Sequence, residues 1–278
     1  MANMDVDGKV VFITGAARGI GLDAAQRLHS GGATVVIVDV DEALAKSEAG
    51  HLGARALGLH GDVIDRAQLD ATVERVIGAF GRIDVVIANA GIAPPVESVR
   101  TGSEEAFDRV LDVNLHGVVN TVRATLPSLL ETGGYLLIIS SLYAIVNGAL
   151  SAPYAMSKTA VEALGRSLRV ELAGTGVDVG VAYFGFIDTK LLREASEKPG
   201  IPELRSSFPG FITKVVPVGR AGTAIADGVA ARAARVTAPK WMRLTLPLRG
   251  LIQYLDGTMV KQRRVRSAID AAEGGSRD

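Results

Sequence analysis

The sequence predicts a doubly wound α/β fold: a parallel sheet with helices on both faces, plus a C-terminal helical extension. Short runs rich in β-branched residues alternate with longer runs of helical periodicity. The short runs are almost continuously apolar, as expected of strands that are buried on both faces. No linker divides the first part of the chain. We therefore expect one large domain over residues 1–238 and an extension over residues 239–278.

Three strand–helix pairs are expected at the start of the chain. KVVFIT (9–14) is followed by the helical pattern of residues 19–30, and ATVVIVD (33–39) is followed by DEALAKSEAGHL. RALGL (55–59) is followed by RAQLDATVERVIGAF. Strands separated by helices need crossover connections, which are right-handed in nearly all cases. The strands should therefore lie parallel, with their carboxyl ends at the edge where such folds bind ligands.

The same alternation continues further along the chain. RIDVVIAN (82–89) precedes a loop and a long helical segment over residues 103–130. GYLLIIS (134–140) precedes another helix, and Pro153 suits the first turn of that helix. VDVGVAY (177–183) follows it and completes the predicted strands.

The composition excludes several kinds of site. Thirty basic and thirty acidic residues give no net charge, so nothing supports nucleic-acid binding. Without cysteine the chain has no disulfide, thiolate metal site or cysteine nucleophile. The amino terminus is unlike a secretory signal and no apolar run reaches ~18 residues, so we expect a cytoplasmic protein. No metal is predicted, because the four histidines are scattered without ligand spacing: His29, His51, His60 and His116.

A glycine-rich turn, TGAARGIG (14–21), directly follows the first strand. Gly15, Gly19 and Gly21 permit a tight turn and let the backbone approach a pyrophosphate at the amino end of the next helix. The spacing differs from G-x-G-x-x-G, and an ordinary strand–helix turn can also contain three glycines. The position after the first strand favours a dinucleotide site.

Two acidic residues at strand ends suit the adenosine half of such a cofactor. Asp39 ends the second strand, where a carboxylate can accept hydrogen bonds from ribose hydroxyls and repel a 2′-phosphate. This favours NAD(H) over NADP(H). NADP(H) stays open because Arg18 could pair with that phosphate, or simply be solvated. Asp62, after the third strand, could meet the adenine amino group or cap the next helix.

The segment SAPYAMSKTA (151–160) places Tyr154 and Lys158 four residues apart in a predicted helix, so their side chains are neighbours. Alone, such a pair is most often two side chains on a helix surface. Ser141 upstream and the TGAARGIG turn favour a chemical role instead.

Together these motifs resemble the classical short-chain dehydrogenase/reductase (SDR) family over about residues 8 to 235. The resemblance implies a Rossmann-type fold and a nicotinamide cofactor. Ser141 lies thirteen residues before Tyr154, the family's usual separation. The sequence departs from the family at Phe184-Gly185, where proline-glycine is usual, and at Ala88, where asparagine is frequent. The matching motifs are TGAARGIG (14–21), GDV (61–63), ANAG (88–91), VNLHG (113–117), IISS (138–141), YAMSK (154–158) and FGFIDT (184–189).

The resemblance implies a role for each matching residue. Ser141 would hydrogen-bond the substrate oxygen, and Lys158 would also reach the nicotinamide ribose. Asn114, in a distorted helix, would hold a water in the proton relay, although it could instead bond a local carbonyl. Asn89, Ala90 and Gly91 would shape the wall beside the adenosine ribose, Ile187 and Thr189 would contact the nicotinamide carboxamide, and Ile20 and Val63 belong to the matching cofactor motifs.

Hydride transfer at an alcohol carbon also moves a proton on oxygen, so the protein must supply an acid/base group. A free phenol has a pKa of ~10, too high for a good base near neutral pH. A nearby cation lowers that pKa, so Lys158 and the oxidised nicotinamide are expected to favour the Tyr154 phenolate. Ser141 adds a donor at the oxygen on which charge develops.

Residues 188–216 mix charge, proline and glycine. In the family this region closes over the substrate, and its length indicates a mobile lid. Phe184, just before it, is expected to narrow the substrate pocket. Five apolar residues could line that pocket or pack a short helix: Leu191, Leu192, Phe208, Phe211 and Ile212.

The tail lacks the family's closing valine-aspartate-glycine-glycine. From Lys240 to Arg266 it has seven basic residues and one acidic residue, Asp256. The helix can roof the substrate pocket, pack on a neighbouring subunit or lie on a membrane surface; we favour packing. Pro247 suits a helix start, and the apolar residues at helical spacing are Leu248, Leu251, Ile252, Leu255 and Met259.

We therefore expect an NAD(H)-preferring oxidoreductase that interconverts a mostly apolar secondary alcohol and its ketone, with Tyr154 as the acid/base. An NADPH-dependent 3-oxoacyl reductase and a non-catalytic dinucleotide-binding sensor are the alternatives. The resemblance also implies a homo-oligomer, a dimer or tetramer, formed through helices around 103–130 and 153–174. The predicted catalytic residues are Asn114, Ser141, Tyr154 and Lys158.

Overall fold

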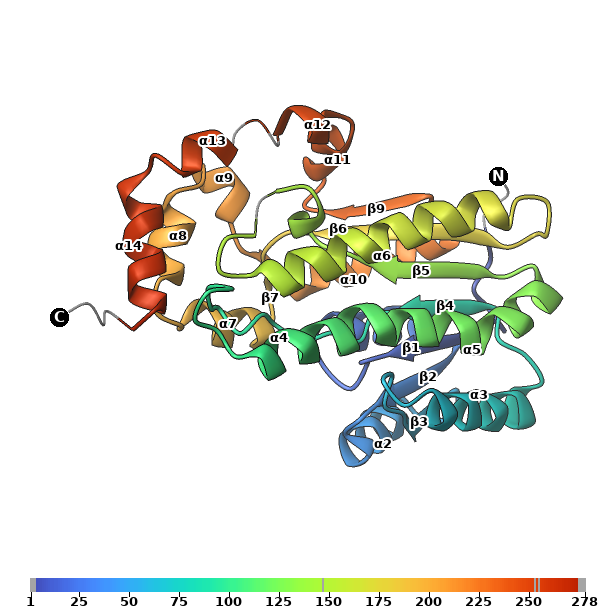
Figure 1. Cartoon of the computed structure of the whole chain (residues 1–278). Coiled ribbons are helices and arrows are strands. Elements are labelled where there is room, and N and C mark those ends of the chain that lie inside the picture. The colour runs from blue at the N-terminus through green and yellow to red at the C-terminus, as the bar shows by residue number, and fades with distance from the viewer. Residues whose placement is uncertain (1–3, 147, 253, 255, 275–278) are drawn as a thin grey trace.

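Seven parallel strands form the centre of the molecule (Figure 1). The computed structural model describes residues 4–146, 148–252, 254 and 256–274. The strand order is β3-β2-β1-β4-β5-β6-β9. It reverses between β1 and β4, which creates a crevice at their carboxyl ends. The strands are β1 (Val10–Thr14), β2 (Thr34–Asp39), β3 (Ala56–His60), β4 (Val85–Ala88), β5 (Tyr135–Ile139), β6 (Asp178–Phe184) and β9 (Arg235–Ala238).

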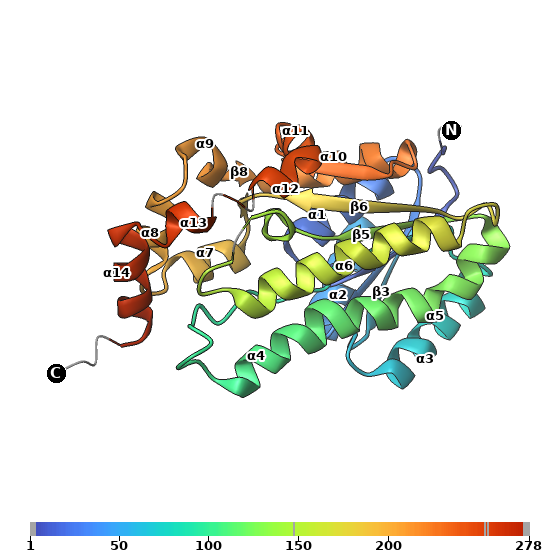
Figure 2. The same ribbon diagram turned by 45° about the horizontal axis from the view of Figure 1, so that its top comes forward.

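Helices cover both faces of the sheet, as predicted (Figures 1 and 2). Side chains alternate along each strand, so Val11 and Ile13 of β1 join one apolar cluster while Val10 and Phe12 join the other. All four are buried, which explains the continuous apolar runs in the sequence. The first cluster includes residues of α1 (Gly19–Ser30), α2 (Glu42–Leu52) and α10 (Val218–Ala230), and the second includes residues of α3 (Arg66–Phe80), α5 (Gly117–Thr132) and α6 (Ala152–Glu171).

The sequence predicts six of the seven strands of this sheet. Neither α10 nor β9 was expected, and neither was a small parallel pair formed by β7 (Ile187–Asp188) and β8 (Val216–Pro217). Glycines interrupt the helical pattern of α10. Gly222 lets α10 approach α1 closely, because a Cβ there would lie 1.7 Å from an Asp23 side-chain oxygen, which would have to move. β9 ends at Ala238, and the division of the chain at residue 238 stays a prediction.

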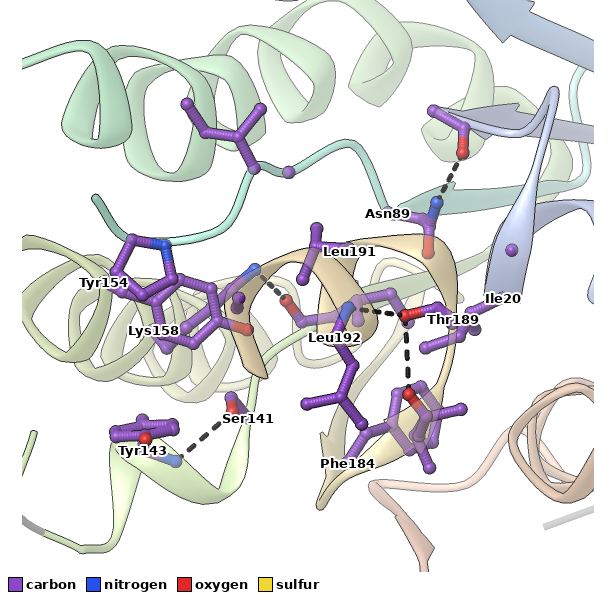
Figure 3. A pocket seen from close by; sticks show the side chains of 18 of the residues that line it. Ile20, Asn89, Ser141, Tyr143, Tyr154, Lys158, Phe184, Thr189, Leu191 and Leu192 are labelled. Atoms are coloured by element: carbon purple, nitrogen blue, oxygen red, sulfur yellow. Dashed lines mark hydrogen bonds between the residues drawn. The ribbon is translucent and has the colours of Figure 1, made fainter. Parts of the chain in front are cut away.

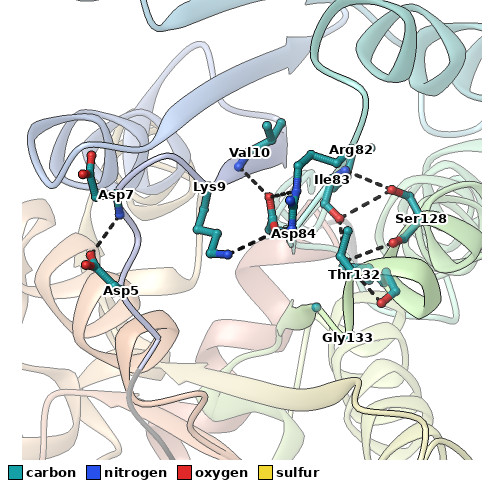
Figure 4. A network of polar contacts seen from close by, with 12 residues as sticks. Asp5, Asp7, Lys9, Val10, Arg82, Ile83, Asp84, Ser128, Thr132 and Gly133 are labelled. Atoms are coloured by element: carbon teal, nitrogen blue, oxygen red, sulfur yellow. Dashed lines mark hydrogen bonds and ion pairs between the residues drawn. The ribbon is translucent and has the colours of Figure 1, made fainter.

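A buried carboxylate joins the strands at the end of the sheet opposite the crevice (Figure 4). Asp84, just before β4, accepts the Val10 N–H at 3.0 Å and the Arg82 Nε–H at 2.9 Å. The neighbouring Ile83 N–H donates to the Ser128 hydroxyl of α5 at 2.9 Å. These bonds fix β1 against β4, so both strands bring their carboxyl ends to the same place.

The lid and the last helices of the tail lie together beyond the carboxyl ends of the strands, on the left in Figure 1. Val265 and Ala268 of α14 (Arg263–Ala272) pack against Ile201 and Leu204 of α8 (Ile201–Ser206). The tail therefore folds back onto the lid of its own chain. The other short elements of the lid are α7 (Lys190–Ser196) and α9 (Gly210–Thr213). Those of the tail are α11 (Met242–Thr245), η3 (Leu246–Leu248), α12 (Arg249–Ile252) and α13 (Asp256–Met259).

The tail does not form the single amphipathic helix that the spacing predicts. Its path is divided among the short elements α11, η3, α12, α13 and α14, and Pro247 lies within the 3₁₀ turn η3. Leu248 and Leu251 are exposed, whereas Met259 packs beside α14. The predicted apolar position Leu255 lies outside the described residues. Within the described ranges no helix is long and apolar enough to cross a membrane.

Candidate active site

A cavity of about 450 Å³ lies at the carboxyl ends of the strands, between the sheet and the lid. It brings together most of the predicted site residues. Gly21 and Asn114 are absent from its lining, and both contact residues that line it. The predicted residues that line the cavity are Gly15, Arg18, Gly19, Ile20, Asp39, Asp62, Val63, Asn89, Ala90, Gly91, Ser141, Tyr154, Lys158, Ile187 and Thr189.

The glycines of the first turn are needed for close packing against β4. Gly15 has a φ of +62°, and a Cβ there would lie 2.7 Å from the Ala90 Cα. A Cβ at Gly21 would lie 2.7 Å from the Asn89 Nδ2. No side chain of these glycines covers the backbone of the turn, so a bound pyrophosphate can approach that backbone closely.

The amino end of α1 has no side-chain cap. Arg18 occupies the N-cap position without a capping bond, while Asp41, Asp65 and Ser103 cap α2, α3 and α4 (Glu104–Leu111). The first N–H groups of α1 can therefore donate to an anion, which fits a dinucleotide. The Arg18 guanidinium is neither simply solvated nor unpaired, because it contacts Asp41 at 2.7 Å.

Asp39 closes β2 and is only 8% exposed. One carboxylate oxygen accepts the Ala17 N–H at 3.1 Å, and the other accepts the Asp41 N–H at 3.2 Å. The carboxylate thus braces the glycine turn and places a buried negative charge at the cavity wall. The sequence left open that Asp62 caps α3. In the structure Asp65 caps this helix, and the Asp62 carboxylate accepts the Ile64 N–H at 3.1 Å.

Two asparagines tie the central segments together. Asn89 donates from Nδ2 to the carbonyls of Thr14 and Gly15, both at 2.9 Å (Figure 3). Asn114 lies fully buried in a π-helical turn, η1 (Asp112–His116), which confirms the expected distortion. Its amide accepts the Ile92 N–H at 2.7 Å and donates to the Ile92 carbonyl at 3.0 Å. This local pairing holds the amide in place, and its part in a proton relay stays a prediction.

Ser141, Tyr143 and Tyr154 lie on one wall of the cavity (Figure 3). Ser141 follows β5, and its hydroxyl accepts the Tyr143 N–H at 3.3 Å at the start of η2 (Leu142–Ala144). Tyr154 lies in the first turn of α6, directly after Pro153. The rings of Tyr143 and Tyr154 meet edge to face, with centroids 5.6 Å apart.

Burial raises the pKa of the Tyr154 phenol to about 12, although a hydrogen bond with the Ser141 hydroxyl acts in the opposite direction. The lowering of this pKa that was expected from Lys158 is therefore not seen in the protein alone. Desolvation of the phenolate dominates, so Tyr154 is protonated near neutral pH.

Lys158 is 4% exposed, and its Nζ donates to the Ile139 carbonyl at 3.1 Å. The amine lies 5.6 Å from the centre of the Tyr154 ring. Burial lowers the pKa of Lys158 to about 8. A Cβ at Gly91 would come within 3.5 Å of the amine and 3.1 Å of the Asn114 Oδ1, so glycine leaves room for this cluster.

The lid contributes some of its predicted apolar residues to the cavity. Leu191, Leu192 and Phe208 line it, whereas Phe211 and Ile212 do not. Phe211 is 60% exposed and stacks edge to face on a tryptophan of the tail, 5.3 Å away. Ile212 packs in an apolar cluster that includes residues of β6 and α11. Phe184, at the end of β6, and Thr189, at the start of the lid, both line the cavity. Thr189 also caps α7.

Several cavity residues were not predicted from the sequence. Tyr143, Phe186 and Arg205 line the substrate end, and Leu204 lies beside them. Arg205 stands in IPELRSSFPG (201–210), where charged, polar and apolar residues mix, so no clear signal in the sequence marked it. The contacts of Tyr143 and Phe186 depend on segments that are far apart in the chain.

The fold and the cavity together define a class of protein. A bare glycine turn, an uncapped helix end and a buried carboxylate after β2 fit a dinucleotide, while a serine, a tyrosine and a lysine meet beyond it. This is a dinucleotide-binding oxidoreductase.

A family model described as short chain dehydrogenase matches residues 9–200. The chain belongs to the short-chain dehydrogenase/reductase family, and it is an NAD(P)-dependent oxidoreductase that acts on CH–OH groups. This family membership also decides against the non-catalytic sensor.

Comparison with individual proteins supports the same family assignment. Galactitol 2-dehydrogenase of Agrobacterium fabrum is 34% identical over 232 residues, which cover 79% of this chain and 87% of that protein. The 3-oxoacyl-[acyl-carrier-protein] reductase of Thermotoga maritima is 36% identical over 203 residues, covering 70% and 80%. The crystal structure of 3-ketoacyl-(acyl-carrier-protein) reductase from Brucella melitensis complexed with NADH is 30% identical with a TM-score of 0.76, covering 84% of this chain and 97% of that one.

Proposed function

We propose that the cavity transfers a hydride between NAD(H) and a secondary alcohol or its ketone, with Tyr154 as the acid/base. The observation that carries this proposal is the convergence of Ser141, Tyr154 and Lys158 on one cavity wall. When bound, the nicotinamide accepts or donates the hydride. The apolar lid residues favour a substrate with a mostly apolar body.

Tyr154 moves the proton on the substrate oxygen. Its phenol is protonated in the protein alone, so it is ready to act as the acid when a ketone is reduced. In the oxidation direction it must act as the base, and the Lys158 amine nearby then favours the phenolate. The Ser141 hydroxyl donates to the same substrate oxygen as charge develops there.

Replacement of Tyr154 by Phe tests this mechanism. Loss of the acid/base group should lower kcat by about 100-fold or more, while NADH binding measured by fluorescence changes little. Tyr254→Phe is the matched control, because that tyrosine is 82% exposed and distant from the cavity lining. Unchanged kcat in Tyr154→Phe for every accepted alcohol would contradict the mechanism.

The cofactor choice rests on Asp39. Its buried carboxylate at the end of β2 supports NAD(H), because a 2′-phosphate placed beside it would meet like charge. We expect NADH to bind at least tenfold more tightly than NADPH, about 1.4 kcal/mol. A clear preference for NADPH in parallel titrations would remove this argument.

A 3-oxoacyl reductase is the second candidate, and it is favoured because two of the similar proteins are reductases of this kind. Such an enzyme would reduce an acetoacetyl thioester far faster than a simple cyclic ketone of similar apolar area. Similar kcat/KM values for both substrates would count against it.

Two expectations about partners stay predictions. Exposed apolar residues on α5 and α6, namely Leu130, Met156 and Val170, support a homo-oligomer through these helices, and light scattering would measure its size. Membrane contact of the tail rests on the exposed Leu248 and Leu251, and flotation with liposomes should weaken when both are replaced by Ser.

A further inference from the structure

The described carboxylates that line the cavity lie at one end of it. Asp39 and Asp62 follow β2 and β3 at the adenosine end, where the lining cation Arg18 pairs with Asp41. At the substrate end, among the lining residues that the structure describes, the charged side chains are all cations: Lys158, Arg109, Lys190 and Arg205. An anionic substrate group would meet no carboxylate there.

Most of these cations are either engaged or exposed. Lys158 donates to a carbonyl of β5, Lys190 lies 3.6 Å from a Glu194 oxygen, and Arg109 is exposed on α4. Arg205 of α8 differs, because it is only partly exposed and no carboxylate of the described residues lies within 4.0 Å of it.

Among the described residues, the groups that bind the Arg205 guanidinium are neutral. One terminal nitrogen donates to the Ser196 hydroxyl at 3.3 Å, and the other donates to the Thr213 carbonyl at 2.9 Å. The guanidinium carbon lies 5.1 Å from the centre of the Phe186 ring, which also lines the cavity. Since guanidinium has five N–H donors, capacity remains for a planar anion.

Arg205 lines the same cavity as the proposed reacting centre. The rings of Tyr143 and Tyr154 there meet edge to face, with centroids 5.6 Å apart. A substrate in this cavity could therefore place its carbinol at Tyr154 and an anionic group at Arg205. Apolar lid residues would then surround its body.

We propose that Arg205 binds a carboxylate of the substrate, so that the enzyme acts on an apolar hydroxy acid and the matching oxo acid. This deepens the proposed function and rests on it. A partly buried cation without a counter-ion gains most from a bidentate carboxylate, since the two charges are then desolvated together. A neutral substrate of the same shape would leave that charge unpaired.

Binding of a non-reacting probe tests the subsite without turnover. The probe is cyclohexanecarboxylate, its neutral counterpart is cyclohexanecarboxamide, and both are titrated calorimetrically into the NADH-loaded protein. We expect the carboxylate to bind about tenfold or more tightly than the amide, and Arg205→Gln to abolish that difference. Arg193→Gln is the control, because Arg193 is an exposed lid cation that pairs with Asp188 outside the cavity lining.

Each outcome decides the proposal. Equal binding of both probes to the wild-type protein overturns it. Equal losses of both probes in Arg205→Gln also overturn it, because they would show that Arg205 only holds the lid. Arg205→Lys keeps the charge and should keep the preference, which covers the case that Arg205→Gln fails to fold.

Turnover separates this proposal from the function on which it rests. Oxidation of neutral alcohols with equal binding of both probes removes the subsite and leaves the oxidoreductase mechanism standing. Preferential carboxylate binding that is lost in Arg205→Gln, without turnover of any hydroxy acid, supports the subsite and removes the proposed reaction.

Discussion

Replacing Lys158 by Met should change how stability depends on pH. Burial lowers the pKa of the amine from 10.5 to about 8, and the unfolded chain keeps the ordinary value. Below pH 8 the amine is charged in both states, and its burial then destabilises the fold by about 3 kcal/mol. Between pH 8 and 10.5 the folded state loses the proton first, so this destabilisation disappears. From pH 7 to pH 9.5 the wild-type protein should gain about 2 kcal/mol from this group.

Urea unfolding of the wild-type protein and Lys158→Met at pH 7 and pH 9.5 measures this gain. Methionine has a similar length and no charge, so the variant shares every other titrating group but lacks this one. Tyr154 does not interfere, because its unfolded phenol ionises only near pH 10 and its folded phenol near 12. Equal pH dependence in the two proteins would refute the conclusion that a charged amine is buried at this site.

Three further tests concern the turn, the tail and the lid. Gly21→Ala should weaken NADH binding about tenfold or more in a fluorescence titration, because its Cβ would displace an asparagine amide and the turn. Gly78→Ala, in open space on α3, should instead stabilise the protein by up to about 1 kcal/mol. A double-mutant cycle of Glu162→Gln and Arg249→Ala should give a coupling of about 1 kcal/mol, because the glutamate is buried and the arginine partly exposed; zero coupling would contradict the contact. Gly200→Ala, at a φ of +82° with its Cβ 2.4 Å from a carbonyl of α14, should speed hydrogen exchange in that helix, and unchanged exchange would contradict the packing.

The central sheet could be predicted because its signal is local. Each strand from Val10–Thr14 to Asp178–Phe184 is a short apolar run, and both faces of it are buried. β9 could not be recognised in the same way. Its four residues, RVTA, include an exposed arginine and a partly buried threonine, and only pairing with β6 identifies it as a strand.

The tail shows that a local sequence pattern can also fail to predict a helix. The spacing of Leu248, Leu251 and Ile252 is helical, yet these residues belong to two short elements rather than one long helix. Ile252 packs near α11, and Leu251 stays 66% exposed. Helical spacing predicts which residues can share a face only while one regular helix continues, and here the 3₁₀ turn η3, which contains Pro247, precedes α12.

The cofactor end of the site was predictable for a related reason. Its residues stand in motifs where one short segment performs one task, such as the turn containing Gly15 and Gly21. The pKa of Tyr154 was not predictable, because it depends on how completely the surrounding segments exclude water. The amide of Asn114 was likewise expected to face a water, and its pairing with Ile92 follows from the approach of a loop 22 residues away.

Part of the substrate end lies outside the region that the family model matches. The family match ends at residue 200, and Arg205 lies just beyond it, on α8. Ile201 and Leu204, which precede Arg205 in the same helix, pack against Val265 and Ala268 of α14. The position of the Arg205 guanidinium therefore depends on tail packing, while the glycine turn and the Tyr154 wall belong to the matched region. Changes in the tail should consequently alter the KM for the substrate more than NADH binding, which links the unusual C-terminal extension to substrate choice.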